Sequence, residues 1–324
     1  MPTCAICLIA EATQTGSHLL SAFMVESTVG KRGSEKGYII DDEPNFDYRI
    51  NTGAAPIIED YMFCRGCEQR MAYVEHYVCS EYRDKFKNNS FQTNFKFTNA
   101  TGYDLQEALY VNYNVFLLFL CTIIYRVSIS KKKLFAGFEL RPDEQERIRL
   151  IIDECLPPYK NFKVKIKRPH FIRDINAKSA LFQDLYFVLA TYEHLKDETQ
   201  SFNIADQYYR LPYNFMFGQI VLYFFFTKPR SAAKYLDFFG ILSEVDLISV
   251  VNGEGANIKT IFLSEEKWHQ ILDVPRKIIV DNKMPGIMQI FFNEFAKQHS
   301  RPPTNDDWLA FTERQFPNPE AGNS

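Results

Sequence analysis

Cys4-Ala-Ile-Cys7 and Cys64-Arg-Gly-Cys67 are the two stretches that determine how the N-terminal part of this chain folds. A C-x2-C pair offers two thiolates to one ion, and two such pairs complete a tetrahedral Cys4 set. The alternatives are chance spacing or a thioredoxin-like redox pair, but two pairs are present and neither lies in a βαβ context. We therefore predict that the four cysteines bind one zinc ion.

The elements expected around these cysteines follow the order of a treble-clef module. The stretch after Cys7 is long enough for a hairpin, and the second pair leads directly into a helical pattern from Glu68 to about Lys87. Its apolar positions recur at spacings of three and four: Met71, Val74, Val78 and Tyr82. Such a module has little core of its own, so metal binding should supply most of its folding energy. A closed Cys4 set has no open coordination position, and the zinc ion should be structural.

Beyond the cysteine module, the sequence predicts an α+β protein with three parts. Residues 1–87 form the Cys4 treble-clef zinc module, residues 88–158 a helical segment, and residues 159–324 an α+β domain with a mixed sheet and no assigned role. In the helical segment, Asp104 is the expected N-cap of a buried helix that starts at Leu105.

The other expected elements follow from local patterns. A helix should start at Arg141-Pro142 and stop at Leu156-Pro157-Pro158, since proline suits a first turn and cannot continue a helix. Strands are expected at Phe162–Lys167, Gln219–Thr227 and, as a pair, within Leu247–Leu263. Flanking helices are expected at Ser179–His194, Ser264–Leu272 and Ile287–His299.

Composition and charge exclude several classes of protein. Of the 324 residues, 46% are hydrophobic and 24% are charged, which excludes a disordered, collagen-like or coiled-coil chain. The formal charge of −3 provides no global positive field, so a basic surface for nucleic acid has to be local. The longest apolar runs are too short for a bilayer, and we expect no membrane association. Seven cysteines and the absence of a secretory pattern predict a cytoplasmic protein without a disulfide framework.

Ser17-His18-Leu-Leu-Ser-Ala-Phe23 lies ten residues past Cys7, and Glu68 directly follows the last cysteine. Here the chain resembles the zinc-knuckle HNH (ββα-metal) endonucleases, in which a C-x2-C pair is followed by a strand with a histidine and then by a C-x2-C pair at the start of a helix. In that family a strand histidine is the general base that activates water for attack on a phosphodiester. By position, the resemblance implies that His18 is the base and that Glu68 or Glu75 on the helix holds a catalytic Mg²⁺ or Mn²⁺. The chain differs from the family at two positions. The family usually has aspartate at the position of Ser17, and it has asparagine or histidine at the position of Glu68.

The combination Ser17-His18 … Phe23 … Cys64-x-x-Cys67-Glu68-Gln69-Arg70 also resembles a group of uncharacterised bacterial proteins, over less than half of the chain. This second resemblance suggests a link to phage defence as a hypothesis. Each site residue has a plainer alternative: His18 as a hydrogen-bond donor beside the zinc ion, Glu68 as an acid favoured by the helix dipole, and Glu75 as solvated surface. The alternative function is accordingly a non-catalytic zinc-knuckle protein that binds nucleic acid or a partner protein.

A basic stripe is the candidate nucleic-acid-binding surface. Its residues are Lys163, Lys165, Lys167 and Arg168, and on an alternating strand the three lysines would share one face. Such a face could follow a phosphate backbone. The equally favoured alternative is an edge strand protected from aggregation by lysines.

Overall fold

The computed structural model describes most of the chain, and the statements below concern only these parts. They are residues 2–21, 24, 58–84, 95–100, 103–132, 135, 138–157, 168–192, 202–204, 213–218, 220–229, 250–253, 257–264, 266, 268, 288–289, 291–299 and 301–315. The helices are α2 (Arg65–Val78), the π-helix η2 (Cys79–Arg83), α4 (Tyr113–Ser128), α5 (Pro142–Cys155), α6 (Arg168–Asn176), the 3-10 helix η6 (Ser179–Phe182) and α10 (Asn305–Gln315).

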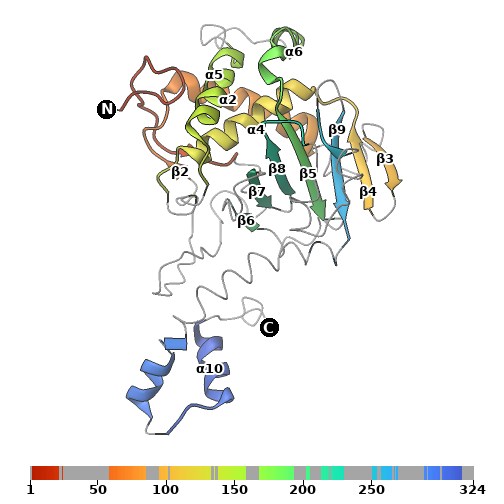
Figure 1. Cartoon of the computed structure of the whole chain (residues 1–324). Coiled ribbons are helices and arrows are strands. Elements are labelled where there is room, and N and C mark those ends of the chain that lie inside the picture. Colours follow the sequence, from red (N-terminus) through yellow and green to blue (C-terminus); the bar gives the residue numbers. More distant parts are fainter. Residues whose placement is uncertain are drawn as a thin grey trace.

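The strands form two sheets. They are β1 (Ser17–His18), β2 (Ile58–Glu59), β3 (Phe95–Ala100), β4 (Tyr103–Ala108), β5 (Tyr186–Tyr192), β6 (Phe202–Ile204), β7 (Tyr213–Gly218), β8 (Ile220–Phe225) and β9 (Ile258–Leu263). β1 and β2 make a two-stranded antiparallel sheet, and the other seven follow the order β3-β4-β9-β5-β8-β7-β6 (Figure 1). β5 and β9 are parallel while the other neighbours are antiparallel, so the large sheet is mixed. The expected α+β class is confirmed.

Helix α4 joins the cysteine-bearing segment to the large sheet. Every residue from Val115 to Val127 is buried, as expected for a helix with apolar residues on nearly all sides. At its start, the rings of Tyr113 and Phe116 stack on Phe187 of β5, with centroid separations of 5.9 and 5.7 Å. One hydrophobic core consequently extends from Cys4 to Ile258 and includes residues of all three predicted parts of the chain.

The expectation of a helical segment throughout 88–158 is wrong for residues 95–100 and 103–108, which form β3 and β4. Asp104, the expected N-cap, lies within β4. The cap of α4 is Asn112, whose side chain accepts a hydrogen bond from the Val115 N–H at 3.1 Å. β4 also pairs with β9, about 150 residues away, and a partner so distant leaves no trace in local periodicity.

The helix expected at Ser179–His194 is also replaced in part. Of its residues, 179–192 are described; within them only the short η6 is helical, and β5 follows it at the centre of the sheet. The residues of β5 from Phe187 to Thr191 are all buried, without the alternation of a half-exposed strand. This pattern does not distinguish a central strand from a buried helix. Within Leu247–Leu263, the described residues form one strand, β9, together with a single bridge between Asn252 and Phe187. The strand expected at Phe162–Lys167 lies outside the described residues.

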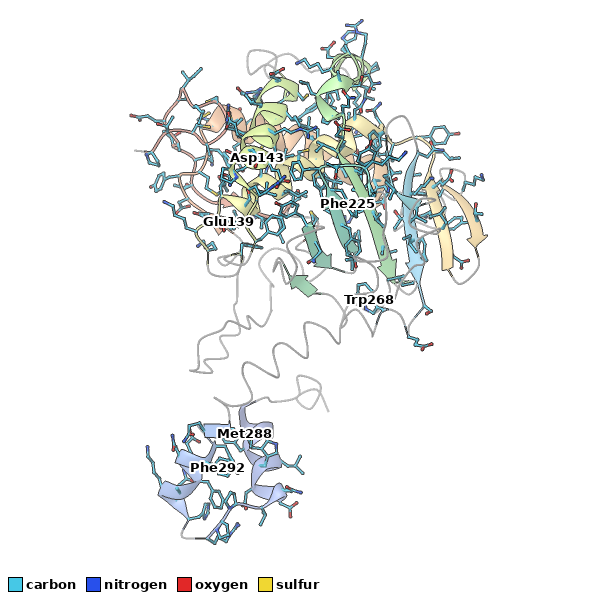
Figure 2. All side chains as sticks on the ribbon, viewed as in Figure 1. Glu139, Asp143, Phe225, Trp268, Met288 and Phe292 are labelled. Atoms are coloured by element: carbon cyan, nitrogen blue, oxygen red, sulfur yellow. The ribbon has the colours of Figure 1, made fainter. Side chains whose placement is uncertain are left out.

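The helical residues 291–298 and helix α10 share a small core of their own. Phe291, Phe295 and Phe311 are buried together, and Trp308 packs against them. Met288 and Phe292, labelled in Figure 2, remain about four-tenths exposed. Among the described residues, no helix combines the length and apolar character needed to cross a membrane.

Candidate metal centre and adjoining polar cluster

The structure brings the four predicted metal ligands together. One Sγ atom each of Cys4, Cys7, Cys64 and Cys67 lies within 4.8 Å of the other three. Tetrahedral coordination at about 2.3 Å from zinc would place sulfur atoms roughly 3.8 Å apart, which is close to this arrangement. All seven cysteines lie in described parts of the chain and each is free, so no disulfide competes for these thiols. The cluster can therefore hold a metal ion such as zinc.

Backbone hydrogen bonds explain why the sulfur atoms converge. The Leu8 N–H donates to the Cys4 carbonyl at 3.1 Å, and Leu8 adopts a left-handed φ of 54° to close this turn. In the second pair, Cys64 is the N-cap of α2 and its Sγ accepts a hydrogen bond from the Cys67 N–H at 3.4 Å. The Ala5 N–H donates to the Met62 carbonyl at 3.0 Å and so ties the two cysteine-bearing loops together. The loops thus present their thiols to one point.

The protonation of the thiols also fits a cation site. A hydrogen bond from the Cys67 thiol lowers the pKa of Cys4 to about 4. The same bond, together with burial, raises the pKa of Cys67, and burial raises that of Cys64. One thiolate is therefore favoured in the cluster, and further thiolates need a positive ion beside them. Metal binding should release protons for this reason.

Ser17 and His18 lie beside the start of α2. In the small sheet, Ser17 pairs with Glu59 and His18 with Ile58. The buried Ser17 hydroxyl donates a hydrogen bond to the Glu68 carboxylate at 3.2 Å, across 51 positions of sequence. The strand that carries His18 is thereby attached to the first turn of α2, directly after Cys67. His18 and Glu68, both predicted site residues, occupy adjoining parts of the structure.

Glu75, the third predicted site residue, is ion-paired. Its carboxylate accepts a hydrogen bond from Arg126 Nη1 at 2.5 Å, and the same nitrogen donates to the His18 carbonyl at 3.1 Å. Arg126 comes from α4 and is 1% exposed. Sequence reasoning missed Arg126, although a single cation inside an otherwise apolar helix was a visible signal. Neither interpretation of Glu75, as a metal ligand or as solvated surface, included this arginine.

The electrostatics of Glu68 follow from this arrangement. Burial is the main cause that raises the pKa of Glu68 above its usual value of 4.5, and the charge of Glu75 adds to it. The positive charge of Arg126 and the Ser17 hydrogen bond act in the opposite direction. Glu68 is thus a half-buried carboxyl group whose ionised form would be stabilised by an additional cation.

The predicted nucleic-acid-binding residues fall largely outside the described parts of the chain. Lys163, Lys165 and Lys167 are not among the described residues. Arg168 is described at the start of α6, where it is exposed and donates hydrogen bonds to Glu81 and to the Ser80 hydroxyl, the latter at 3.0 Å. Its guanidinium is therefore already engaged by the end of the α2–η2 helix.

Comparison of this chain with protein-family models, with curated proteins and with solved structures finds no match. Function consequently has to be inferred from the contacts and charges of this chain itself.

Proposed function

We propose that the protein is a metal-dependent, HNH-like endonuclease that cleaves phosphodiester bonds in nucleic acid, with His18 as the general base. The observation that carries the proposal is the hydrogen bond between Ser17 and Glu68. It attaches the strand that carries His18 to a carboxylate on the first helical turn, beside a Cys4 cluster. A base and an acidic group at one end of a ββα arrangement are the parts that such a reaction needs.

The cysteine cluster serves as the scaffold in this proposal. The elements follow the order of a treble clef. The loop with Cys4 and Cys7 comes first, the antiparallel pair of β1 and β2 comes next, and Cys64 and Cys67 lie at the start of α2. A zinc ion held by four cysteines has no open position for water, so its contribution would be to folding. The cluster would hold α2 and the hairpin in the relative position that sets His18 against Glu68.

The proposed reaction assigns a separate task to each side chain. The imidazole of His18 accepts a proton from water, and the resulting hydroxide oxygen bonds to phosphorus. The bond from phosphorus to the leaving oxygen breaks with its electron pair, and that oxygen takes up a proton from solvent. A Mg²⁺ or Mn²⁺ ion bound at Glu68 would stabilise the negative charge that develops. Glu75 binds Arg126, which holds the His18 backbone, so Glu75 is assigned a positioning role.

Replacement of His18 tests the proposal. His18→Ala should leave fold and zinc content unchanged while lowering metal-dependent cleavage by about 10²–10⁴-fold, the usual contribution of positioned proton transfer. His76→Ala is the matched control, since His76 is exposed on α2 and makes no part of the cluster. Cleavage must also stop when a chelator removes Mg²⁺ or Mn²⁺. A His18→Ala protein that cleaves as fast as wild type would overturn the assignment.

The Arg126–Glu75 ion pair favours a second candidate function. The buried guanidinium of Arg126 already supplies positive charge to the carboxylates of Glu68 and Glu75. With Ser17 in place of an aspartate, these residues offer a divalent ion fewer carboxylates than hard cations usually receive. On this alternative, the zinc-bearing module is a rigid platform that binds nucleic acid or a partner protein without cleaving it. Mn²⁺ binding at Glu68 would favour the enzyme, and its absence the platform.

A further inference from the structure

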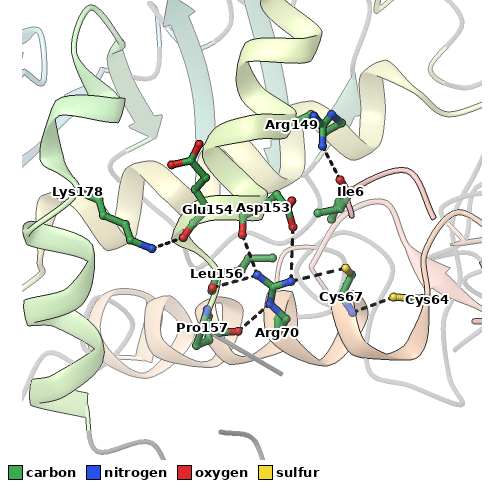
Figure 3. A network of polar contacts seen from close by, with 10 residues as sticks. All are labelled: Ile6, Cys64, Cys67, Arg70, Arg149, Asp153, Glu154, Leu156, Pro157 and Lys178. Atoms are coloured by element: carbon green, nitrogen blue, oxygen red, sulfur yellow. Dashed lines mark hydrogen bonds and ion pairs between the residues drawn. The ribbon is translucent and has the colours of Figure 1, made fainter. Parts of the chain in front are cut away.

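We propose that Arg70 and Arg149 are part of the metal site as its outer shell, and that through them metal binding is linked to the docking of helix α5. The two arginines connect the cysteine loops with α5 in opposite directions (Figure 3). Arg70 reaches from α2 to the end of α5, and Arg149 reaches from α5 to the first cysteine loop. The proposal requires metal binding by the four cysteines, and it holds whether or not the protein is a nuclease.

Arg70 contacts both a metal ligand and the end of α5. Its Nη1 donates to Cys67 Sγ at 3.9 Å and lies 3.7 Å from the Asp153 carboxylate. Its Nη2 donates to the carbonyls of Asp153 at 2.9 Å and Leu156 at 3.0 Å, and its Nε to the Pro157 carbonyl at 2.7 Å. All three nitrogens of one guanidinium are used. The last carbonyls of a helix have no partner within it, and here Arg70 supplies one.

Arg149 makes the reciprocal connection. Its Nη1 donates to the carbonyl of Ile6, between the first two cysteines, at 2.7 Å. The side chain is held in that direction by Glu146, which accepts hydrogen bonds from Nε at 2.7 Å and Nη2 at 2.6 Å. Arg149 is buried, so the contact is shielded from water. One helix is thereby fixed to both halves of the metal site.

The charge of a loaded site explains why arginines occupy these places. Zinc with four thiolates carries a net charge of roughly −2. A guanidinium beside Cys67 and another beside the first loop oppose that charge, and a hydrogen bond to sulfur withdraws electron density from the thiolate. Interactions that orient and tune ligands in this way typically change metal affinity by about 10–100-fold.

Linkage between the two events follows from thermodynamics. If the ordered sulfur cluster strengthens the Arg70 and Arg149 contacts, these contacts strengthen metal binding by the same factor. Loss of the metal should therefore loosen α5, beginning at Asp153 and Leu156. The Glu154 carbonyl, which accepts a hydrogen bond from Lys178 outside the metal site, provides an anchor that does not depend on metal.

Cobalt binding gives the first test, because Co²⁺ replaces zinc and its sulfur-to-metal charge-transfer bands report on the thiolates. Arg70→Met and Arg149→Met should weaken Co²⁺ binding by about 10–100-fold in competition with a chelator. Arg70→Met should also shift the charge-transfer bands, while Arg70→Lys should restore part of the affinity. The matched control is Arg147→Met, since Arg147 also reaches from α5 to a backbone carbonyl, that of Gln183, away from the cysteines.

Hydrogen exchange of the full-length chain gives the second test. Removal of the metal from wild-type protein should increase exchange in α5 more than in β8, which makes no contact with the cluster through either arginine. In Arg70→Met protein, exchange in α5 should be high with or without metal. The proposal is overturned if α5 exchanges at the same rate with and without metal, or if α5 and β8 lose protection equally. It is also overturned if Arg147→Met weakens Co²⁺ binding as much as Arg149→Met, or if the chain binds no Co²⁺.

Discussion

Removal of one partner from the ion pair between Arg126 and Glu75 should cost far more stability than removal of one partner from a surface pair. Its two charged side chains are 2% and 19% exposed and approach to 2.5 Å. With charge centres about 4 Å apart and an effective dielectric constant near 20, the attraction is about 4 kcal/mol. Removal of one partner leaves the other buried and uncompensated, which costs roughly 3–5 kcal/mol. Arg126→Met and Glu75→Leu should each destabilise the fold by about this amount.

A double-mutant cycle isolates the interaction. The combined Arg126→Met and Glu75→Leu protein should be no less stable than either single variant, which corresponds to a coupling energy of at least about 3 kcal/mol. Urea denaturation of the zinc-loaded protein measures all four free energies of unfolding. The Arg173–Asp174 pair, in which both side chains are exposed, is the control, where a coupling energy below about 1 kcal/mol is expected. Equal and small coupling in both cycles would refute the assignment of Arg126 and Glu75 as the support of the His18 strand.

Three further predictions follow from named contacts. Glu68→Gln should gain stability relative to wild type as the pH rises above 4.5, because the pKa of Glu68 is raised in the folded protein and the unfolded wild type therefore ionises more readily than the folded one. A stability difference that stays constant between pH 4 and 8, measured by denaturation without Mg²⁺, would contradict this. Asn112→Ala should cost about 1 kcal/mol through loss of the α4 cap, and an unchanged midpoint in thermal unfolding would contradict this. Cys64→Ser should abolish zinc binding and expose α5 as well as residues 2–21 and 58–84 to proteolysis, since these segments contribute to one core. Selective loss of the N-terminal part alone would contradict this.

Local patterns were sufficient to predict the metal site and several helices. The four cysteines could be assigned because pair spacing reflects loop geometry and thiolate chemistry, both of which are local. Helices α2 and α5 were predictable for the same reason, and the structure places Pro142 in the first turn of α5 and ends that helix before Leu156. The strands β3, β4 and β5 were not, because their stability comes from partners far along the chain.

The site residues also divide into those that local patterns predict and those that depend on distant partners. The order of cysteine pairs, strand and helix was enough to predict that the strand of His18 and the start of α2 belong to one module, and the hydrogen bond from Ser17 to Glu68 joins the two elements. Arg126 was not predicted, since its partners Glu75 and His18 lie 51 and 108 positions away and only the packing of α4 against α2 brings them together. Contacts of this kind depend on how helices pack, which a single sequence does not specify.

X-ray anomalous scattering from crystals grown with Mn²⁺ would test the central claim most directly, because it locates zinc and manganese separately. We expect one zinc ion about 2.3 Å from the four sulfur atoms of the cysteine cluster, and one manganese ion bound to Glu68 on the side that faces His18. Zinc alone would contradict the proposed nuclease site while leaving the structural metal centre in place. A cysteine cluster without zinc, or with Cys4 disulfide-bonded, would contradict the metal centre on which both proposals depend.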